Sequence, residues 1–248
     1  MELDALAFGA HVDDLELACG ATLAKLTGNG YRIGACELTA GELSTRGTPE
    51  ERETEAQNAA EILGLQMRMN LGIPDGNIEE SQENKLKVIR IIREYRPRFI
   101  FVNYWKCRHF DHIHTSNVVS EACFYSGLRK IDTGQEAFRP HFIFYYFLRH
   151  EFEPTFIVDV SDTWETKMDA IKAHKTQFYD PNSKEPNTFI SSEYFLDSIV
   201  NRMKYFGMRI GAEYGEPFLV KETLKMNDPF SFFDKMDPIR IMTTTDQG

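Results

Sequence analysis

A histidine and two adjacent carboxylates follow the first apolar run of the chain. His11, Asp13 and Asp14 lie where a pattern typical of a buried strand gives way to a helical one. Imidazole and carboxylate groups bind Zn²⁺ and similar divalent ions, and a carboxylate beside such an ion can act as a general base. An Asp-Asp pair at a helix start is equally typical of N-terminal capping. This stretch by itself leaves both interpretations open.

A second polar cluster, Arg108-His-Phe-Asp-His-Ile-His114, follows the apolar run 99–103. Taken alone, it is either a solvated loop or a metal-binding segment. In open parallel sheets, ligands bind beyond the carboxyl ends of the strands, and both clusters follow predicted strands. Two histidines and one carboxylate would leave a coordination position open for water, as in hydrolytic metal sites. Together the clusters favour such a site.

Alternating strand and helix patterns predict the elements that position these clusters. Strands are expected at residues 5–10, 32–39, 67–71, 99–103, 142–148 and 156–160. Helices are expected at residues 14–27, 50–63, 82–95, 114–128, 164–177 and 192–210. The polar loop 179–187 is expected to be a mobile flap or a solvated connection. The alternation predicts an α/β fold with a Rossmann-like, mostly parallel sheet, helices on both faces and an active site at the carboxyl ends of the strands.

The composition is that of an ordinary globular protein. The 248 residues include 42% hydrophobic residues and carry a net charge of −10, which argues against a general nucleic-acid or anionic-membrane binder. Four cysteines without a CxxC pair indicate reduced thiols. No signal-peptide pattern or apolar run of roughly 20 residues is present. We expect a cytoplasmic protein with one domain over 1–248: a core at 1–160, and C-terminal helices, the flap and a frayed tail (243–248) at 161–248.

Two motifs resemble those of a known family. Ala10-His-Val-Asp-Asp-Leu-Glu16 resembles the AHPDDxE signature of the LmbE-like (PIG-L) zinc deacetylases, and Arg108-His-Phe-Asp-His112 resembles their RHPDH motif. Similar segments include Ile73-Pro-Asp-Gly76 and Ala173-His-Lys-Thr-Gln177. The segments 173–177, 193–197 and 206–218 resemble the bacillithiol-biosynthesis branch, whose members deacetylate N-acetyl-glucosaminyl-malate. Val12 and Phe110 replace the usual prolines, which puts the rigidity of both loops in question because proline fixes φ.

The resemblance implies a role for each polar residue of the motifs. The zinc ligands it implies are His11, Asp14 and His112, with Fe²⁺ or another divalent ion as an alternative to Zn²⁺. It implies that Asp13 is the general base and that His109, oriented by Asp111, stabilises the oxyanion. Zinc lowers the pKa of a bound water to about 7, and the charge of Asp111 should favour the imidazolium form of His109.

A malate group carries two carboxylates, so its pocket needs cations, and arginine binds carboxylates bidentately. The candidates for substrate binding are Arg46, Arg52, Arg108 and Arg139. By the resemblance, Arg139 is instead expected to approach Asp13. Tyr194 is expected either to hydrogen-bond the substrate or to pack in the core. Glu16, His114 and His174 are expected to be structural or surface residues.

The leading hypothesis is a metal-dependent N-deacetylase that acts on N-acetyl-α-D-glucosaminyl L-malate. A deacetylase or amidase for another N-acetylglucosaminide or a thiol conjugate is the alternative. The resemblance also implies a homo-oligomer, often a hexamer. A nucleotide-binding protein is disfavoured because the first turn lacks Gly-x-Gly-x-x-Gly. A non-catalytic zinc protein is disfavoured because Asp13 and His109 are not needed to hold a metal.

Overall fold

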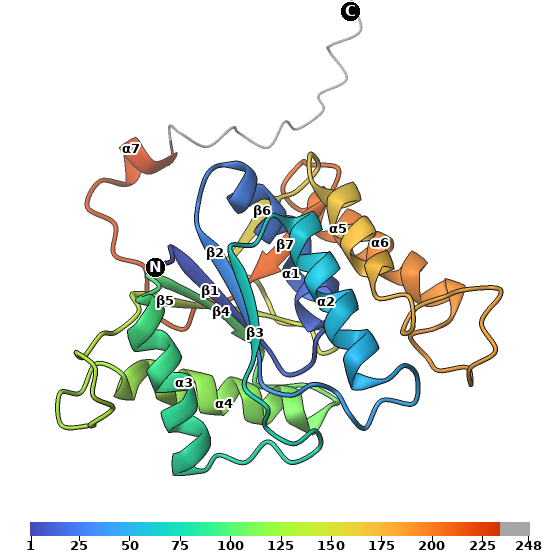
Figure 1. Ribbon diagram of the computed structural model, residues 1–248. Coiled ribbons are helices and arrows are strands. Elements are labelled where there is room, and N and C mark those ends of the chain that lie inside the picture. The colour runs from blue at the N-terminus through green and yellow to red at the C-terminus, as the bar shows by residue number, and fades with distance from the viewer. Residues whose placement is uncertain (234–248) are drawn as a thin grey trace, which may run out of the picture.

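Five parallel strands form the central sheet of the protein, which a computed structural model describes over residues 1–233 (Figure 1). Their order is β3-β2-β1-β4-β5. The strands are β1 (Ala5–Gly9), β2 (Ile33–Glu37), β3 (Met67–Asn70), β4 (Phe99–Asn103) and β5 (Phe142–Tyr146). All four pairings are parallel, which confirms the expected sheet. The tail expected at 243–248 lies outside the described residues.

Helices cover both faces of this sheet, as expected (Figure 1). On one face lie α3 (Gln82–Tyr95) and α4 (Phe110–Tyr125), and on the other lie α1 (Asp14–Gly28), α2 (Pro49–Leu63) and α5 (Trp164–Ala173). Side chains alternate along β1, because successive strand residues point to opposite faces. Leu6 and Phe8 pack with the α3–α4 layer, whereas the small Ala5 and Ala7 pack with α1. Burial on both faces explains why the strands are continuous apolar runs.

The last predicted strand does not join this sheet. The strand β6 (Phe156–Asp159) pairs antiparallel with β7 (Gly215–Phe218) in a separate two-stranded sheet. The sequence did not predict β7, because its four residues include a glycine and a proline, which are depleted in strands. The short helix α7 (Pro229–Phe233) was also not predicted. Within residues 1–233, none of the helices combines the length and apolar character needed to cross a bilayer.

The helix after β4 begins earlier than expected. α4 starts at Phe110, not at residue 114, and His109 is its N-cap residue. The polar cluster resembles a loop in sequence, but polar side chains are favourable in a first helical turn because they can bond its free amides. As a result, Asp111 and His112 lie on a helix that starts at the carboxyl edge of the sheet. The two later helices are shorter than expected, with α5 ending at Ala173 and α6 (Glu193–Met208) ending at Met208.

A kink divides α1, the helix that begins with the first motif. Cys19 has non-helical dihedral angles (φ −130°, ψ 15°). The carboxylate of Glu216, on β7, accepts hydrogen bonds from the amides of Ala21 (3.2 Å) and Thr22 (2.7 Å), so it caps the second half of the helix. The buried Lys167 amino group on α5 lies 2.6 Å from the same carboxylate. These contacts tie β7 and α5 to α1.

Candidate metal centre and active-site cavity

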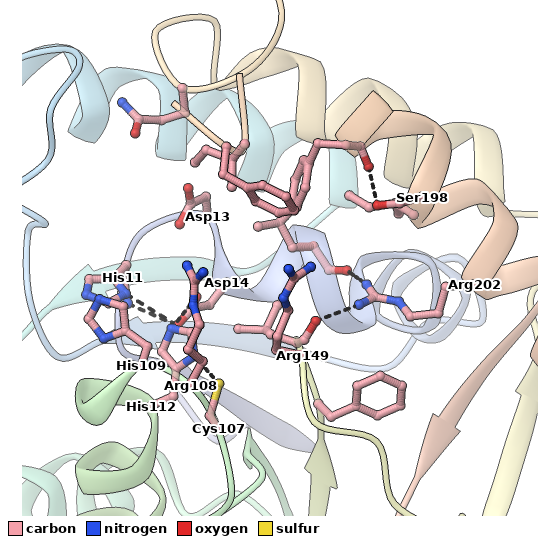
Figure 2. A pocket seen from close by; sticks show the side chains of 18 of the residues that line it. His11, Asp13, Asp14, Cys107, Arg108, His109, His112, Arg149, Ser198 and Arg202 are labelled. Carbon is pink, nitrogen blue, oxygen red and sulfur yellow. Dashed lines mark hydrogen bonds and ion pairs between the residues drawn. The ribbon is translucent and has the colours of Figure 1, made fainter. Parts of the chain in front are cut away.

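Three donor groups converge where β1 and β4 end at the same edge of the sheet (Figure 2). The ligand atoms of His11, Asp14 and His112 all lie within 4.8 Å of one another. The Nε2 atom of His112 is 3.2 Å from Oδ1 of Asp14, and Nδ1 of His11 is 3.9 Å from Oδ2 of Asp14. The pairing of β1 with β4 thus brings the two motifs together although about 100 residues separate them.

Backbone amides hold the Asp14 carboxylate in place. Its Oδ2 atom accepts hydrogen bonds from the amides of Ala10 (2.9 Å) and His11 (3.2 Å) and from the side-chain amide of Asn103 (3.4 Å). Hydrogen bonds to a charged acceptor are stronger than neutral ones. They fix the carboxylate so that Oδ1 faces His112.

Each histidine of the centre also has a partner for its second ring nitrogen. The Nε2 atom of His11 is 3.1 Å from Asp75 and 3.5 Å from Asp111, and Nδ1 of His112 is 3.1 Å from the Cys107 sulfur. Metal-binding histidines nearly always donate their other N–H to such an acceptor. The group His11, His109 and Asp111 is equally compact, but it would use the nitrogen that Asp75 already contacts. The geometry therefore favours His11, Asp14 and His112 as the candidate metal ligands.

The carboxylates of the centre favour positive charge. Burial alone would lower the pKa of His11, but Asp111 and Asp75 raise it to about 10. Burial would also lower the pKa of His112, but the charge of Asp14 raises it to about 9. A divalent cation would take the place of these protons, because metal ligands bind in their deprotonated forms. The charge and the donor types therefore both fit a divalent ion such as Zn²⁺.

Asp75 was missed as a site residue, although its segment Ile73-Pro-Asp-Gly76 resembled the family. The available signal was its position just after β3, at the same edge of the sheet as both motifs. The amide of Gly76 also donates to Oδ2 of Asp111 (2.9 Å). The loop after β3 thus supports two residues of the site.

Asp75→Asn is expected to weaken zinc binding by about 10- to 100-fold, because acceptors of this kind orient the metal-binding histidine. Competition with a chromogenic chelator measures the dissociation constant. Asp197→Asn, which removes an exposed carboxylate from α6, is the matched control and should bind zinc like the unaltered chain. Equal affinities for all three proteins would show that Asp75 does not orient His11.

Arg52, not Arg139, lies beside Asp13. The Nη2 atom of Arg52 is 3.7 Å from the Asp13 carboxylate, and its Nη1 atom donates to the carbonyl of Gly41 (2.7 Å). Gly41 has φ +69°, and a Cβ there would lie 1.8 Å from Arg52 Nη1, so the close approach requires glycine. Arg139 instead donates to the carbonyl of Phe124, at the far end of α4. The expectation for Arg139 is wrong because its guanidinium bonds the Phe124 carbonyl and lies 4.5 Å from the Phe124 ring, away from the site.

Asp111 contacts His109 through its backbone. The Asp111 amide donates to Nδ1 of His109 (3.3 Å), whereas its carboxylate faces His11 and Gly76. The expectation that the charge of Asp111 favours the imidazolium form of His109 is not met. Burial, with the nearby His11 and His112, lowers the pKa of His109, against the opposing charge of Asp111. Because Nδ1 accepts a hydrogen bond, neutral His109 carries its proton on Nε2 and still offers a donor.

A cavity of about 690 Å³ extends from the metal centre toward α6 (Figure 2). Arg52 and Arg108 line it, and so do Arg149 and Arg202, which the sequence did not single out. The arginine ion pairs found within residues 1–233 do not include Arg108 or Arg149. Two guanidinium groups without an acidic partner in this part of the chain therefore face one cavity.

Arg46 and Tyr194 lie outside the lining of this cavity. Arg46 is buried and donates to Glu185 (3.2 Å) and Ser183 (2.6 Å). It thus anchors the polar loop before α6, which is the segment expected to be a flap or a connection. Tyr194 is 71% exposed at the start of α6. Neither residue is placed to bind a substrate within the cavity.

Arg68, on β3, holds the first motif loop. Its guanidinium contacts Glu16 (2.6 Å) and Glu37 (2.9 Å), and it donates to the carbonyl of Val12 (2.5 Å). Glu16 is fully buried and also lies 3.5 Å from His174, so both have the structural role expected of them. The bond to Val12 fixes the loop at the position where the family has proline.

Glu37 is expected to make the protein less stable as the pH rises from about 5 to 8. Burial raises the pKa of Glu37 from its ordinary value of 4.5 to about 7, although the positive charge of Arg68 lowers it. The folded state therefore holds this proton more tightly than the unfolded chain. Its stabilising contribution is complete below the unfolded pKa and is lost as the pH rises through about 7.

Glu37→Gln should flatten this part of the pH dependence. Urea denaturation at several pH values measures the free energy of unfolding. Glu2→Gln, which changes a carboxylate with 67% side-chain exposure, should leave the profile unchanged. Identical slopes for Glu37→Gln and the unaltered chain would contradict the assignment.

The sequence matches a known family over its first half. The family model of PIG-L, described as GlcNAc-PI de-N-acetylase, matches residues 6–123. Diacetylchitobiose deacetylase from Thermococcus kodakarensis is 29% identical in an alignment of 184 residues that covers 68% of this chain and 67% of that protein.

Solved structures extend the similarity to nearly the whole chain. The conserved protein TT1542 from Thermus thermophilus is 35% identical, with a TM-score of 0.83 over 90% of this chain and 97% of its own. The N,N'-diacetylchitobiose deacetylase from Pyrococcus horikoshii shares the fold at 24% identity, with a TM-score of 0.78 over 95% of this chain and 87% of its own. Residues 6–123 therefore match the PIG-L family, and the chain shares its fold with TT1542 and with the diacetylchitobiose deacetylase.

Proposed function

We propose that the chain hydrolyses the acetamido group of an N-acetylated amino-sugar glycoside. The observation that carries the proposal is the gathering of five side chains at one end of the cavity. These are His11, Asp13, Asp14, His109 and His112. Three of them fit a divalent ion, and the other two supply a base and a hydrogen-bond donor. A structural metal site would need neither of these two groups.

Each of these groups has a task in amide hydrolysis. A divalent cation held by His11, Asp14 and His112 would supply Lewis-acid polarisation of the amide carbonyl and a lower pKa for the attacking water. The Asp13 carboxylate takes the proton of the attacking water and later delivers it to the departing amine. His109 donates its Nε2–H to the carbonyl oxygen as negative charge develops there, a contribution of about 3 kcal/mol. Arg52, beside Asp13, positions the base.

For the substrate, we propose N-acetyl-α-D-glucosaminyl L-malate, an intermediate of bacillithiol biosynthesis. Arg108 and Arg149 support this choice, because both line the cavity and malate carries two carboxylates that guanidinium groups bind well. Another N-acetylglucosaminide or a thiol conjugate is the alternative. We further propose Zn²⁺ as the metal, a cytoplasmic site of action and a homo-oligomer, with a hexamer expected from light scattering.

Acetate release tests the proposal. The full chain, loaded with one zinc ion, is incubated separately with the malyl glycoside, diacetylchitobiose and methyl N-acetylglucosaminide. We expect acetate from at least one of them, with the highest kcat/KM for the malyl glycoside. Higher kcat/KM for diacetylchitobiose would support the alternative substrate. No acetate from any glycoside, with zinc verified, would show that the chain is not this deacetylase.

A further inference from the structure

We propose that the part of the cavity next to α6 binds an alkyl or aryl aglycone, so that the enzyme also deacetylates N-acetylglucosaminides with an apolar group on the anomeric carbon. The inference rests on the proposed N-deacetylase function and adds a substrate class to the same cavity. We call this part of the cavity the apolar arm. Its side chains are Leu17, Phe147, Leu148, Phe189, Ile190, Phe195 and Ile199.

The apolar arm is built from three separate parts of the chain. Leu17 lies on α1, Phe147 and Leu148 follow β5, and the other four side chains come from the segment 189–199 that leads into α6. The rings of Phe189 and Phe195 pack edge to face with centroids 5.5 Å apart. The guanidinium of Arg149 lies 4.5 Å from the Phe189 ring. In Figure 2, His11 and His112 lie on one side of the view and α6 with Ser198 and Arg202 lies on the other.

Two of the polar side chains that line this part of the cavity, Arg202 and Ser198, are already bonded to the backbone. The guanidinium of Arg202 donates to the carbonyls of Leu148 (2.9 Å) and Leu17 (2.5 Å). The hydroxyl of Ser198 donates to the carbonyl of Phe195 (2.6 Å). A polar aglycone placed there would lose its hydrogen bonds to water without full replacement, which is unfavourable. An apolar aglycone would instead gain about 25 cal/mol for each Å² that it buries.

The volume and the direction of the cavity are consistent with binding of an apolar aglycone. A volume of about 690 Å³ lies within the range of roughly 300–1,000 Å³ found for pockets that hold drug-sized ligands. The acetamido group must reach the metal centre, so the sugar occupies that end and its aglycone extends toward α6. Phe189 is 44% exposed in the free protein, and an apolar aglycone would cover it. Arg108 and Arg149 remain accessible to the carboxylates of malate, so the two aglycone classes use different groups.

A series of methyl, butyl, hexyl and octyl N-acetylglucosaminides, used below their micelle-forming concentrations, tests the apolar arm. We expect kcat/KM for acetate release to rise about 3- to 4-fold for each added methylene until the arm is filled. Phe189→Ser should lower kcat/KM for the octyl glycoside about 10-fold and leave the methyl glycoside nearly unchanged. Phe124→Ser, which alters another exposed phenylalanine, on α4, is the matched control and should change neither.

Binding provides a second measurement that does not depend on turnover. In calorimetric titrations of the zinc-loaded chain, the hexyl glycoside should bind more tightly than the methyl glycoside. Acetate release with equal kcat/KM along the series would overturn the apolar arm and leave the deacetylase function standing. Equal losses for methyl and octyl glycosides in Phe189→Ser would also overturn it. Absence of acetate from every glycoside, together with chain-length-dependent binding, would overturn the deacetylase function and the added substrate class, and would leave the apolar arm as a binding site.

Discussion

Asp13→Asn is expected to lower kcat for acetate release by about 10²- to 10⁴-fold while the zinc content stays near one ion per chain. The amide cannot accept the proton of the attacking water, and general-base catalysis contributes an effect of this size. The side chain of Asp13 lines the cavity but is not one of the three converging ligands. Its loss should therefore affect the chemical step and not the metal.

Metal analysis and acetate release on the same preparation measure both parts of this expectation. Asn is nearly isosteric with Asp, so the contact with Arg52 is altered in charge but hardly in shape. Asp197→Asn on α6 is the matched control and should retain full turnover. Loss of zinc from Asp13→Asn would mean that Asp13 helps to hold the metal. Full activity with zinc bound would remove Asp13 from the catalytic machinery.

Arg68→Met is expected to lower the free energy of unfolding by roughly 3–5 kcal/mol, because removing one partner of a buried ion pair leaves the other charge uncompensated. The Arg68 side chain is only 1% exposed and contacts two buried carboxylates, Glu16 and Glu37. Arg68 holds the pKa of Glu16 down at about 2 although burial alone would raise it. The variant also frees the carbonyl of Val12, so zinc binding should weaken as well.

Urea denaturation at pH 7 measures this loss, with two comparisons. Arg98→Met, which breaks an exposed pair with Asp4, should change the free energy of unfolding by less than about 1 kcal/mol. The double variant Glu16→Gln/Arg68→Met should recover part of the loss, because it removes the uncompensated charge. A change of less than about 1 kcal/mol for Arg68→Met would contradict the buried-network assignment. No recovery in the double variant would show that the loss arises from packing.

Much of the fold could be predicted from local patterns. A strand that is buried on both faces is a continuous apolar run, and an amphipathic helix repeats its apolar residues every three or four positions. Each of these patterns can be recognised within a short stretch of sequence. The five parallel strands and the main helices were therefore predicted. The strand β7 carries no such signal. It is a strand only because β6 lies beside it, and that neighbour is fixed by the packing of the whole chain.

The candidate site, like the fold, could be predicted only in part from residues that are close together in sequence. The sequence by itself determined that His11, Asp14 and His112 stand beside predicted strand ends, since motif and strand are adjacent in the chain. Only the tertiary structure decided that Arg52 and not Arg139 reaches Asp13, and that Asp75 and Cys107 hold the two histidines. A long side chain can point in several directions from the same position. The helices and strands that pack around the side chain determine which direction it takes, and the residues next to it in sequence do not.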